Sequence, residues 1–495
     1  MSTQRPLTHV QCGRAICAVF LLLASIRIGA AQVPASNTTA SEMPTAQTSS
    51  ATMAPQMMEM PLPNKVLGQM PATGYSIAGE VTGILQRLSA FPSPYSGPNS
   101  LRSRNETELT HTYTLYLGAR PTPQFEVYLN PELAQGNGIS QGAGLAGYSN
   151  GDLIGQPSQP HEPYIARFFV RWRIPLHRAS AVSDQTAAVQ PGTNLIGGSL
   201  PASRLIITAG KFAISDHFDV NSYANSARSQ FLNNAFINNL AFDKASDIRG
   251  YNLGLMASLV NTGIALRLGS FAMPTSAGDP DLAYKFANTH SEQIELELRR
   301  PLLHGHSASP LILRILAYRN VGSMGRYRDS MRSSMPGTPP DITTVRRRGA
   351  VKYGFGLNFE QAIGDGGATG IFGRAGWNDG STESYSYAEA DRFLSLGGQV
   401  SGAHWGRPND ILGVGLEQSD LADAHKAYLE AGGLGLSLGD GKLNYGSEQI
   451  GEGYYAHPLS KALTLTLDYQ WINHPGYNND RGPVSLIAFR THLAF

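Results

Sequence analysis

From residue 74 onward, apolar and polar side chains alternate in segments of about ten residues that are separated by turns. In "ALTLTLDYQW", for example, Leu463, Leu465 and Leu467 alternate with threonine and aspartate. Because successive side chains of an extended chain point to opposite faces, this period of two predicts β-strands. Sixteen such segments begin near residues 75, 110, 124, 163, 203, 248, 263, 291, 309, 350, 368, 391, 410, 441, 462 and 483.

The connections between these segments alternate in length. Those after the odd-numbered segments are long, whereas most of those after the even-numbered segments are short, such as "PTP", "NT" and "GDGG". The link 177–202 and the moderate "HWGRPN" are the exceptions. Long loops at one end and short turns at the other are typical of outer-membrane barrels, and a soluble β-sandwich has no reason to sort its loops in this way. We therefore predict an all-β protein, with a transmembrane antiparallel barrel of about sixteen strands and long extracellular loops over residues 75–495.

The fifth connection, at about 215–247, is long and contains helix-compatible stretches with apolar residues such as Phe231, Ala235 and Phe236. Two arrangements are open for this segment. It can fold inward and narrow the pore, or it can form a helical loop outside the barrel.

The sequence before the barrel has two parts. Residues 1–31 carry Arg5 and Arg14, then the apolar run "AICAVFLLLASI" and small residues before Gln32, which together predict a secretory signal peptide. Residues 32–74 are rich in Ser, Thr, Ala, Pro and Met and are predicted to be a disordered linker. The methionines of segment 43–70 could bind Cu(I), but a flexible linker that happens to contain methionine is the simpler interpretation.

Charged residues recur on the strand faces opposite the apolar ones. In "PYIARFFVRWRIPL" three arginines share one face, which a dry core would not accommodate but a water-filled pore would. Arginine side chains can span neighbouring hydroxyl groups or bind an anion. Because both signs of charge are present, the set favours neutral polyols such as sugars over strong ion selectivity. The alternative is that the charges only pair across the pore wall. The predicted pore-lining residues are Arg167, Arg171, Arg173, Glu126, Arg267, Glu295, Glu360, Glu448, Asp468 and Arg490.

Composition argues against several other classes of protein. The net charge of +1 gives no footprint for a nucleic-acid partner. The two cysteines, Cys12 and Cys17, lie within the predicted signal peptide, so the mature barrel has no thiol nucleophile. No HExxH, P-loop or nucleophile-elbow motif is present, and His304 and His306 lie in a predicted solvated turn. We expect neither an enzyme nor a cofactor or metal site, although nothing in the sequence formally excludes a Ser/His hydrolase.

The C-terminal residues resemble the OprB family of carbohydrate-selective porins. The resemblance rests on an N-Y-G-x-E element at 444–448, on the paired Tyr454 and Tyr455, and on the "PGYNNDRGP" loop at 475–483. An R-x-H strand that ends in Phe495 completes the match, and weaker similarities extend back to about residue 75. The resemblance implies a sixteen-stranded barrel in the bacterial outer membrane through which glucose and other sugars diffuse. A general or anion-preferring porin, and a non-conducting structural or adhesin barrel, are the alternatives.

The last strand has its own predicted contacts. Ile487 and Phe489 are expected to face lipid, while Arg490 and His492 face the lumen and the strand pairs back to the first segment near residue 75. A terminal phenylalanine on an alternating strand also resembles the signal that outer-membrane barrels present to the barrel assembly machinery. The expected partners are therefore carbohydrate solutes, outer-membrane lipid and, through Phe495, that machinery. A monomer and a homotrimer are both open.

Overall fold

The computed structural model describes residues 74–155, 161–176, 186–189, 192–284, 286, 288–300, 310–386 and 389–495. The predicted signal peptide, the linker up to residue 73 with its methionine-rich segment, and the two turn histidines at 304 and 306 lie outside these ranges. Within them, we find no helix with the length and apolar character needed to cross a membrane.

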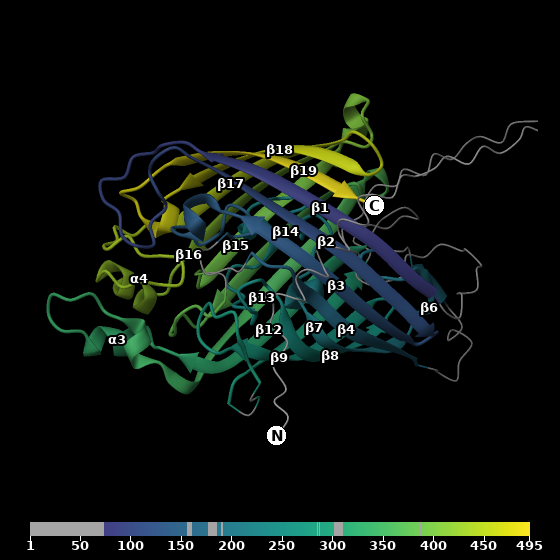
Figure 1. Ribbon diagram of the computed structural model, residues 1–495, viewed down its shortest axis with the longest axis horizontal. Coiled ribbons are helices and arrows are strands. Elements are labelled where there is room, and N and C mark those ends of the chain that lie inside the picture. The colour runs from purple at the N-terminus through teal and green to yellow at the C-terminus, as the bar shows by residue number, and fades with distance from the viewer. Residues whose placement is uncertain are drawn as a thin grey trace, which may run out of the picture.

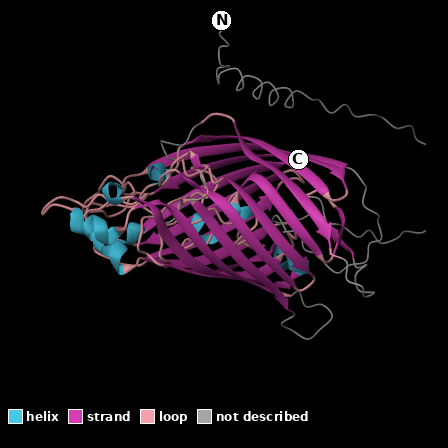
Figure 2. Cartoon of the chain, turned by 90° about the horizontal axis from the view of Figure 1, so that it is seen from below, coloured by secondary structure: helices cyan, strands magenta, loops and turns pink. Residues whose placement is uncertain are grey.

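Sixteen long strands form a closed antiparallel ring, as the alternation predicts (Figures 1 and 2). Each strand pairs with the next long strand along the chain, and the last pairs back to the first. The ring consists of β1 (Gly74–Leu88), β2 (Glu106–Thr122), β3 (Phe125–Gly136), β4 (Tyr164–Pro175), β7 (Arg204–Phe212), β8 (Asn252–Asn261), β9 (Ile264–Pro274), β11 (His290–Arg300), β12 (Leu311–Met324), β13 (Arg347–Gly364), β14 (Thr369–Asn378), β15 (Arg392–Ser401), β16 (Ile411–Asp420), β17 (Glu448–Pro458), β18 (Leu463–Asn473) and β19 (Val484–Ala494).

Three short strands lie outside the ring. β10 (Leu282–Ala283) extends the edge of β9, and β5 (Thr186–Val189) pairs with β6 (Gly198–Pro201) as a separate hairpin in the link between β4 and β7. Figure 1 places β6 at the end of the barrel opposite α3 (Tyr327–Ser333) and α4 (Asp423–Glu430), which lie in the long connections. The end with the long loops is therefore extracellular, and the β5–β6 hairpin belongs to the periplasmic end.

The remaining helical segments are single turns in the connections. They are α2 (Asn234–Ile237), η1 (Ile139–Gly142), η2 (Ile214–Asp216), η3 (Ile342–Val345), η4 (Asp365–Gly367), η5 (Gly402–Trp405) and η6 (Pro475–Tyr477).

Strand positions agree closely with the sequence pattern, with one clear exception. The fourteenth strand was expected from residue 441, but β17 begins at Glu448. The residues before it belong to an extracellular loop, in which Gly441 adopts a left-handed φ of 84° that is incompatible with an extended strand. An isolated bridge between Tyr445 and Asn478 holds this loop against the next extracellular loop.

The two faces of the strands have the predicted character. On β18 and β19, Leu467 and Ile487 are 58% and 53% exposed, whereas Arg490 is 1% exposed. The apolar side chains face outward, where they meet lipid, and the polar ones face the interior of the barrel. This confirms the expected orientation of the closing strand, including the inward position of His492, which is 3% exposed.

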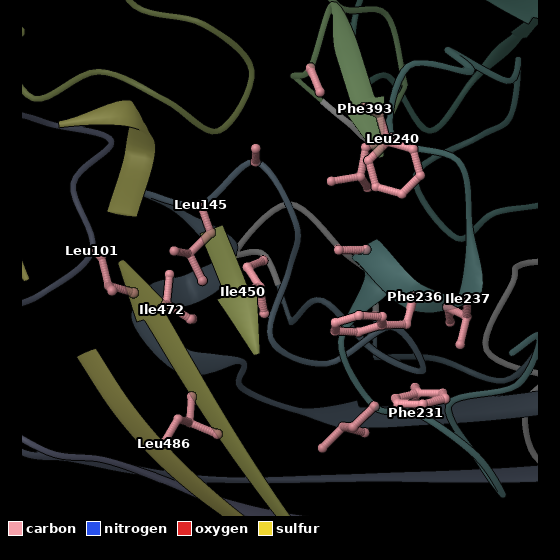
Figure 3. Close-up of a cluster of buried hydrophobic side chains, with 14 of the residues drawn as sticks. Leu101, Leu145, Phe231, Phe236, Ile237, Leu240, Phe393, Ile450, Ile472 and Leu486 are labelled. Carbon is pink, nitrogen blue, oxygen red and sulfur yellow. The ribbon is translucent and has the colours of Figure 1, made fainter. Parts of the chain in front are cut away.

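The long segment between β7 and β8 folds into the barrel, which is the first of the two arrangements considered for it. Phe231 and Phe236 are fully buried and pack against side chains of β17 and β19, among them Ile450 and Leu486 (Figure 3). Their rings stack with centroids 5.0 Å apart. The barrel interior is therefore largely filled by this segment, residues 213–251, which we call the inner loop.

Glycines in the barrel wall make room for the inner loop. A Cβ atom at Gly376 would lie 2.1 Å from the Asn239 side chain, and one at Gly415 would lie 2.7 Å from the Phe236 ring. Neither position leaves space for a side chain, so the smooth glycine surface allows the loop to lie directly on the strands.

The outward face of β18 provides a test of the barrel orientation. We expect Leu467→Arg to reduce the yield of folded barrel, because a charge at the lipid-facing midplane costs about 2–4 kcal/mol. The folded fraction is measured as the heat-modifiable band on unheated gels after refolding into lipid. Leu467→Met is the matched control and should fold like the wild type; equal yields of the two variants would contradict the assignment of this face.

Candidate functional site

Arg228, near the middle of the inner loop, binds five oxygen acceptors on four other segments of the chain. Its Nε donates to Asp152 at 2.7 Å, and Nη2 donates to Glu132 at 3.0 Å. The remaining nitrogen, Nη1, donates to the following groups: Glu80 at 3.2 Å, Thr114 Oγ1 at 2.8 Å and the hydroxyl of Tyr116 at 3.2 Å. Ionic hydrogen bonds of this kind are the strong ones. The guanidinium thereby fixes the inner loop to β1, β2, β3 and the β3–β4 connection.

A cavity of about 260 Å³ lies beside this guanidinium. It is bordered by the inner loop, by the β3–β4 connection and by side chains of β1, β2, β4 and β19. Both signs of charge line it, together with two tyrosines. The relevant lining residues are Arg167, Arg228, Lys244, Arg249, Glu80, Asp152, Asp216, Tyr116, Tyr251 and His492.

The polar side chains of the cavity are held by one another. Arg167 forms a two-pronged ion pair with Asp216, in which Nε and Nη2 both lie 2.7 Å from the carboxylate oxygens. The same guanidinium lies over the Tyr251 ring, 5.0 Å from its centroid, and the Tyr251 hydroxyl donates to Glu132 at 2.8 Å. The planar groups are therefore pre-oriented, which lowers the entropic cost of binding a solute.

Two groups of the inner loop have shifted pKa values. Burial by itself would raise the pKa of Asp216, but the ion pair with Arg167 lowers it below its usual range. Burial lowers the pKa of Lys244 to about 8, against the opposing attraction of Asp219. Asp216 is therefore ionised at neutral pH, whereas Lys244 loses its charge in mildly alkaline solution.

All ten residues predicted to line the pore lie on the inner face of the barrel, but Arg167 is the one that borders this cavity. Glu126 on β3 is fully buried and gathers the arginines of neighbouring strands. Its carboxylate binds Arg120 at 2.7 Å and Arg171 at 3.5 Å, and also binds Arg173. Two members of the predicted arginine row therefore form a buried cluster beside β3 instead of projecting into open solvent.

The other predicted residues mainly hold inserted segments in place. Arg267 binds Glu295 and Glu297 at 2.9 Å each, and Glu295 accepts the backbone N–H of Asp219 in the inner loop at 2.7 Å. Arg490 donates to the carbonyls of Ala227 and Gln230, both at 2.7 Å.

Three predicted carboxylates have similar surroundings. Glu360 binds Arg314 at 3.1 Å and accepts the backbone N–H of Ser222. Glu448 accepts the backbone N–H groups of Ala146 at 3.0 Å and Gly476 at 2.6 Å. Asp468 is buried and accepts from Gln470 at 3.2 Å. A permeation role for these residues, apart from Arg167, stays a prediction.

Sequence reasoning missed the central residue, Arg228. The pattern of alternating strands does not describe loops, so a loop arginine carried no weight. One signal was nevertheless present: between Asp219 and Asp243, Arg228 is the single charged residue in a stretch of otherwise neutral side chains. A lone charge in a segment that enters a barrel must find partners on the wall.

Metal chemistry receives no support from the geometry. In the described ranges, no group of three or more histidine, cysteine or acidic side chains is arranged to hold a metal ion.

The closed sixteen-stranded ring, its apolar outer surface and its narrowed polar interior define an outer-membrane porin. The family model described as "Carbohydrate-selective porin, OprB family" matches residues 99–495. The chain therefore belongs to the OprB family, and it is a carbohydrate porin of the bacterial outer membrane. This confirms the resemblance, the fold, the location and the function expected from the sequence.

Solved structures show the same fold. The structure of OprB from Pseudomonas putida determined at high pH has a TM-score of 0.63 and 14% identity, covering 85% of this chain and 94% of that chain. The structure of the same protein at low pH has a TM-score of 0.42 and 13% identity, over 85% and 93% of the two chains. OccK8 (OprE) of Pseudomonas aeruginosa has a TM-score of 0.41 and 10% identity, over 85% and 98%. No curated protein sequence matches the chain.

The Arg228 contacts generate a direct prediction about the pore. We expect Arg228→Ala to release the inner loop and raise the single-channel conductance, because breaking a buried ion pair costs up to about 3–5 kcal/mol and leaves its carboxylate partners unpaired. The measurement is single-channel recording in planar bilayers, where open-state noise should also increase. Arg347→Ala, at an arginine whose side chain is 76% exposed, is the control and should conduct like the wild type. A wild-type conductance for Arg228→Ala would show that the inner loop is held by other contacts.

Proposed function

We propose that sugars cross the barrel through the cavity beside Arg228, and that its lining groups select them by hydrogen bonding. The observation that carries the proposal is the dense array of fixed donors and acceptors on one wall and the inner loop. Arginines supply planar donors, carboxylates supply acceptors, and tyrosines supply both hydroxyl groups and ring faces. Neutral polyols match such a lining because each hydroxyl group donates and accepts. The proposal requires no catalytic step, and we expect no enzymatic activity.

The charge balance of the lining supports neutral solutes over ions. Four basic residues, Arg167, Arg228, Lys244 and Arg249, face three acidic ones, Glu80, Asp152 and Asp216, in the same cavity. Each side therefore offsets most of the field of the other, and only a weak preference for anions is left. Strong anion selection, the alternative considered from the arginine row, would need an excess of one sign along the route.

A sugar-block experiment tests this route. We expect glucose or a maltodextrin to reduce the ion current through the wild-type channel, because a bound sugar occupies a cavity of about 260 Å³ that is the narrow part of the route. Arg167→Gln should weaken this block by about tenfold in concentration, corresponding to the loss of one ionic hydrogen-bonding group worth about 1.5 kcal/mol.

The same recordings include two controls. Arg347→Gln, on the outside of the barrel, should leave the block unchanged. A block of equal strength in Arg167→Gln and wild type would exclude this cavity as the sugar site, and strong anion selectivity without any sugar block would contradict the proposal as a whole.

Lys244 makes the ion preference depend on pH. With its pKa at about 8, the amine is charged at lower pH and neutral at higher pH, so raising the pH removes one positive charge from the cavity. We expect the weak anion preference to decline between about pH 7 and pH 9. Reversal potentials in a salt gradient measure this change, and Lys244→Met should abolish it. A pH dependence that survives in Lys244→Met would assign the titration to another group.

Assembly of the barrel is also a proposal. The Phe495 side chain is 70% exposed at the periplasmic end of β19, and the last residue still pairs with Gly79 of β1 through backbone hydrogen bonds at 2.8 and 3.0 Å. An exposed terminal aromatic ring is what the barrel assembly machinery would bind before the ring closes. Since closure satisfies all strand edges within one chain, the fold itself needs no second subunit, and monomer and homotrimer both stay predictions. The domain limits 1–31, 32–74 and 75–495 stay predictions as well.

A further inference from the structure

The connection between β4 and β7 breaks the rule that periplasmic turns are short, and its described part enters the barrel. Strands β5 and β6 pair from Thr186↔Pro201 to Val189↔Gly198, so the link is a hairpin. Its tip is a tight turn in which the backbones of Gly192 and Leu195 exchange hydrogen bonds at 2.9 and 3.0 Å. Asn194 occupies the turn with φ of 55°, a left-handed conformation that asparagine tolerates.

The tip of this hairpin reaches the middle of the barrel wall. Asn194 and Asn130 exchange two side-chain hydrogen bonds of 2.9 Å, each amide donating to the other. The Asn194 carbonyl also accepts from Arg171 at 3.1 Å. Asn130 is the strand partner of Arg167, which lines the cavity. The tip therefore lies at the depth of the cavity, and Thr193 is one of the cavity's lining residues.

The sides of the tip are fixed as firmly as its end. The fully buried guanidinium of Arg120 donates to the carbonyl of Gly197 at 3.2 Å and also to that of Ile196. The backbone N–H of Ile196 donates to the hydroxyl of Tyr128 at 3.2 Å. The Ile196 side chain is buried in the apolar cluster that contains Tyr128 and Phe169. Buried ionic hydrogen bonds of this kind are costly to break, so the tip is a fixed part of the lumen.

These contacts also give a function to the buried Glu126 cluster. Glu126 binds Arg120 and Arg171, and both of these arginines in turn hold backbone carbonyls of the tip. The buried carboxylate thus orients two donors toward the periplasmic hairpin.

We propose that residues 192–197 form the periplasmic floor of the cavity and set the upper size of the solute that leaves it. This inference rests on the proposed sugar route, and it adds a second inserted segment, opposite the inner loop, to the narrow part of the pore. The residues that face the solute are Thr193 and Asn194, whose hydroxyl and amide groups suit a polyol. The floor is a fixed specificity element and does not move during passage.

Removal of the hairpin is the first test. The N–H of Leu176 already donates to the carbonyl of Ser203 at 3.1 Å, so β4 and β7 are paired where the hairpin leaves them. Replacing residues 177–202 by Asn-Gly, a preferred two-residue hairpin turn, closes the gap directly. We expect the conductance to rise about twofold or more, since a lining segment is lost, and longer oligosaccharides to enter in liposome-swelling assays. An unchanged conductance and size limit would overturn the proposal.

A pair of point substitutions tests the floor without removing any chain. Thr193 lines the cavity, whereas the adjacent Gly192 is exposed and has open space around its Cβ position. We expect Thr193→Trp to lower the conductance by about half or more, because the indole occupies the lumen, and Gly192→Trp to leave it unchanged. An unchanged conductance in Thr193→Trp, or an equal loss in both variants, would overturn the proposal.

These currents are recorded without sugar, so the two proposals can fail separately. If the conductances change as expected but glucose does not block the wild type, the floor is confirmed and the sugar route is wrong. If glucose blocks the wild type while both hairpin tests leave the conductance unchanged, the floor is wrong and the sugar route stands.

Discussion

The interior of this barrel depends on the five hydrogen bonds of the Arg228 guanidinium. A sixteen-stranded ring is wide enough to leave an aqueous channel, and its walls alone would discriminate little between small solutes. By joining the inner loop to three strands and to the β3–β4 connection, Arg228 converts this wide tube into a narrow polar cavity. The acidic residues around it are tolerable in the interior because the same guanidinium neutralises them.

Most lumenal charges of the wall serve the same purpose at other points. Arg490 and Glu295 bind the backbone of the inner loop, and Glu448 binds the backbone of two extracellular loops. Backbone groups that enter a barrel lose their contact with bulk water, so each needs a partner. Strand side chains of either charge supply these partners. A mixed lumen is therefore a consequence of filling the barrel with irregular chain, as well as a means of recognising a solute.

Selectivity in this design resides in inserted segments, while the strands provide a rigid frame. The inner loop belongs to an extracellular connection and the β5–β6 hairpin to a periplasmic one. Both meet the wall near Arg167, which pairs with Asp216 of the inner loop and lies in register with Asn130, the partner of the hairpin tip. Such segments can change in sequence without disturbing the ladder of the barrel, because loops tolerate variation better than strands do.

The sequence by itself determined the barrel: its strand number, the position of nearly every strand, and which side chains face lipid. A period of two is a local property that a lipid-facing wall imposes on each strand separately, so Leu467 and Arg490 could be placed without knowledge of any neighbour. The one misplaced strand start, at Glu448, follows glycines whose φ angles the alternation does not report. Only the tertiary structure decided that the lumen is filled, that Arg167 alone of the ten predicted residues borders the cavity, and that Arg228 holds it together. The physical reason is that loops carry no periodic signal, and the partners of an inserted charge lie far away in sequence.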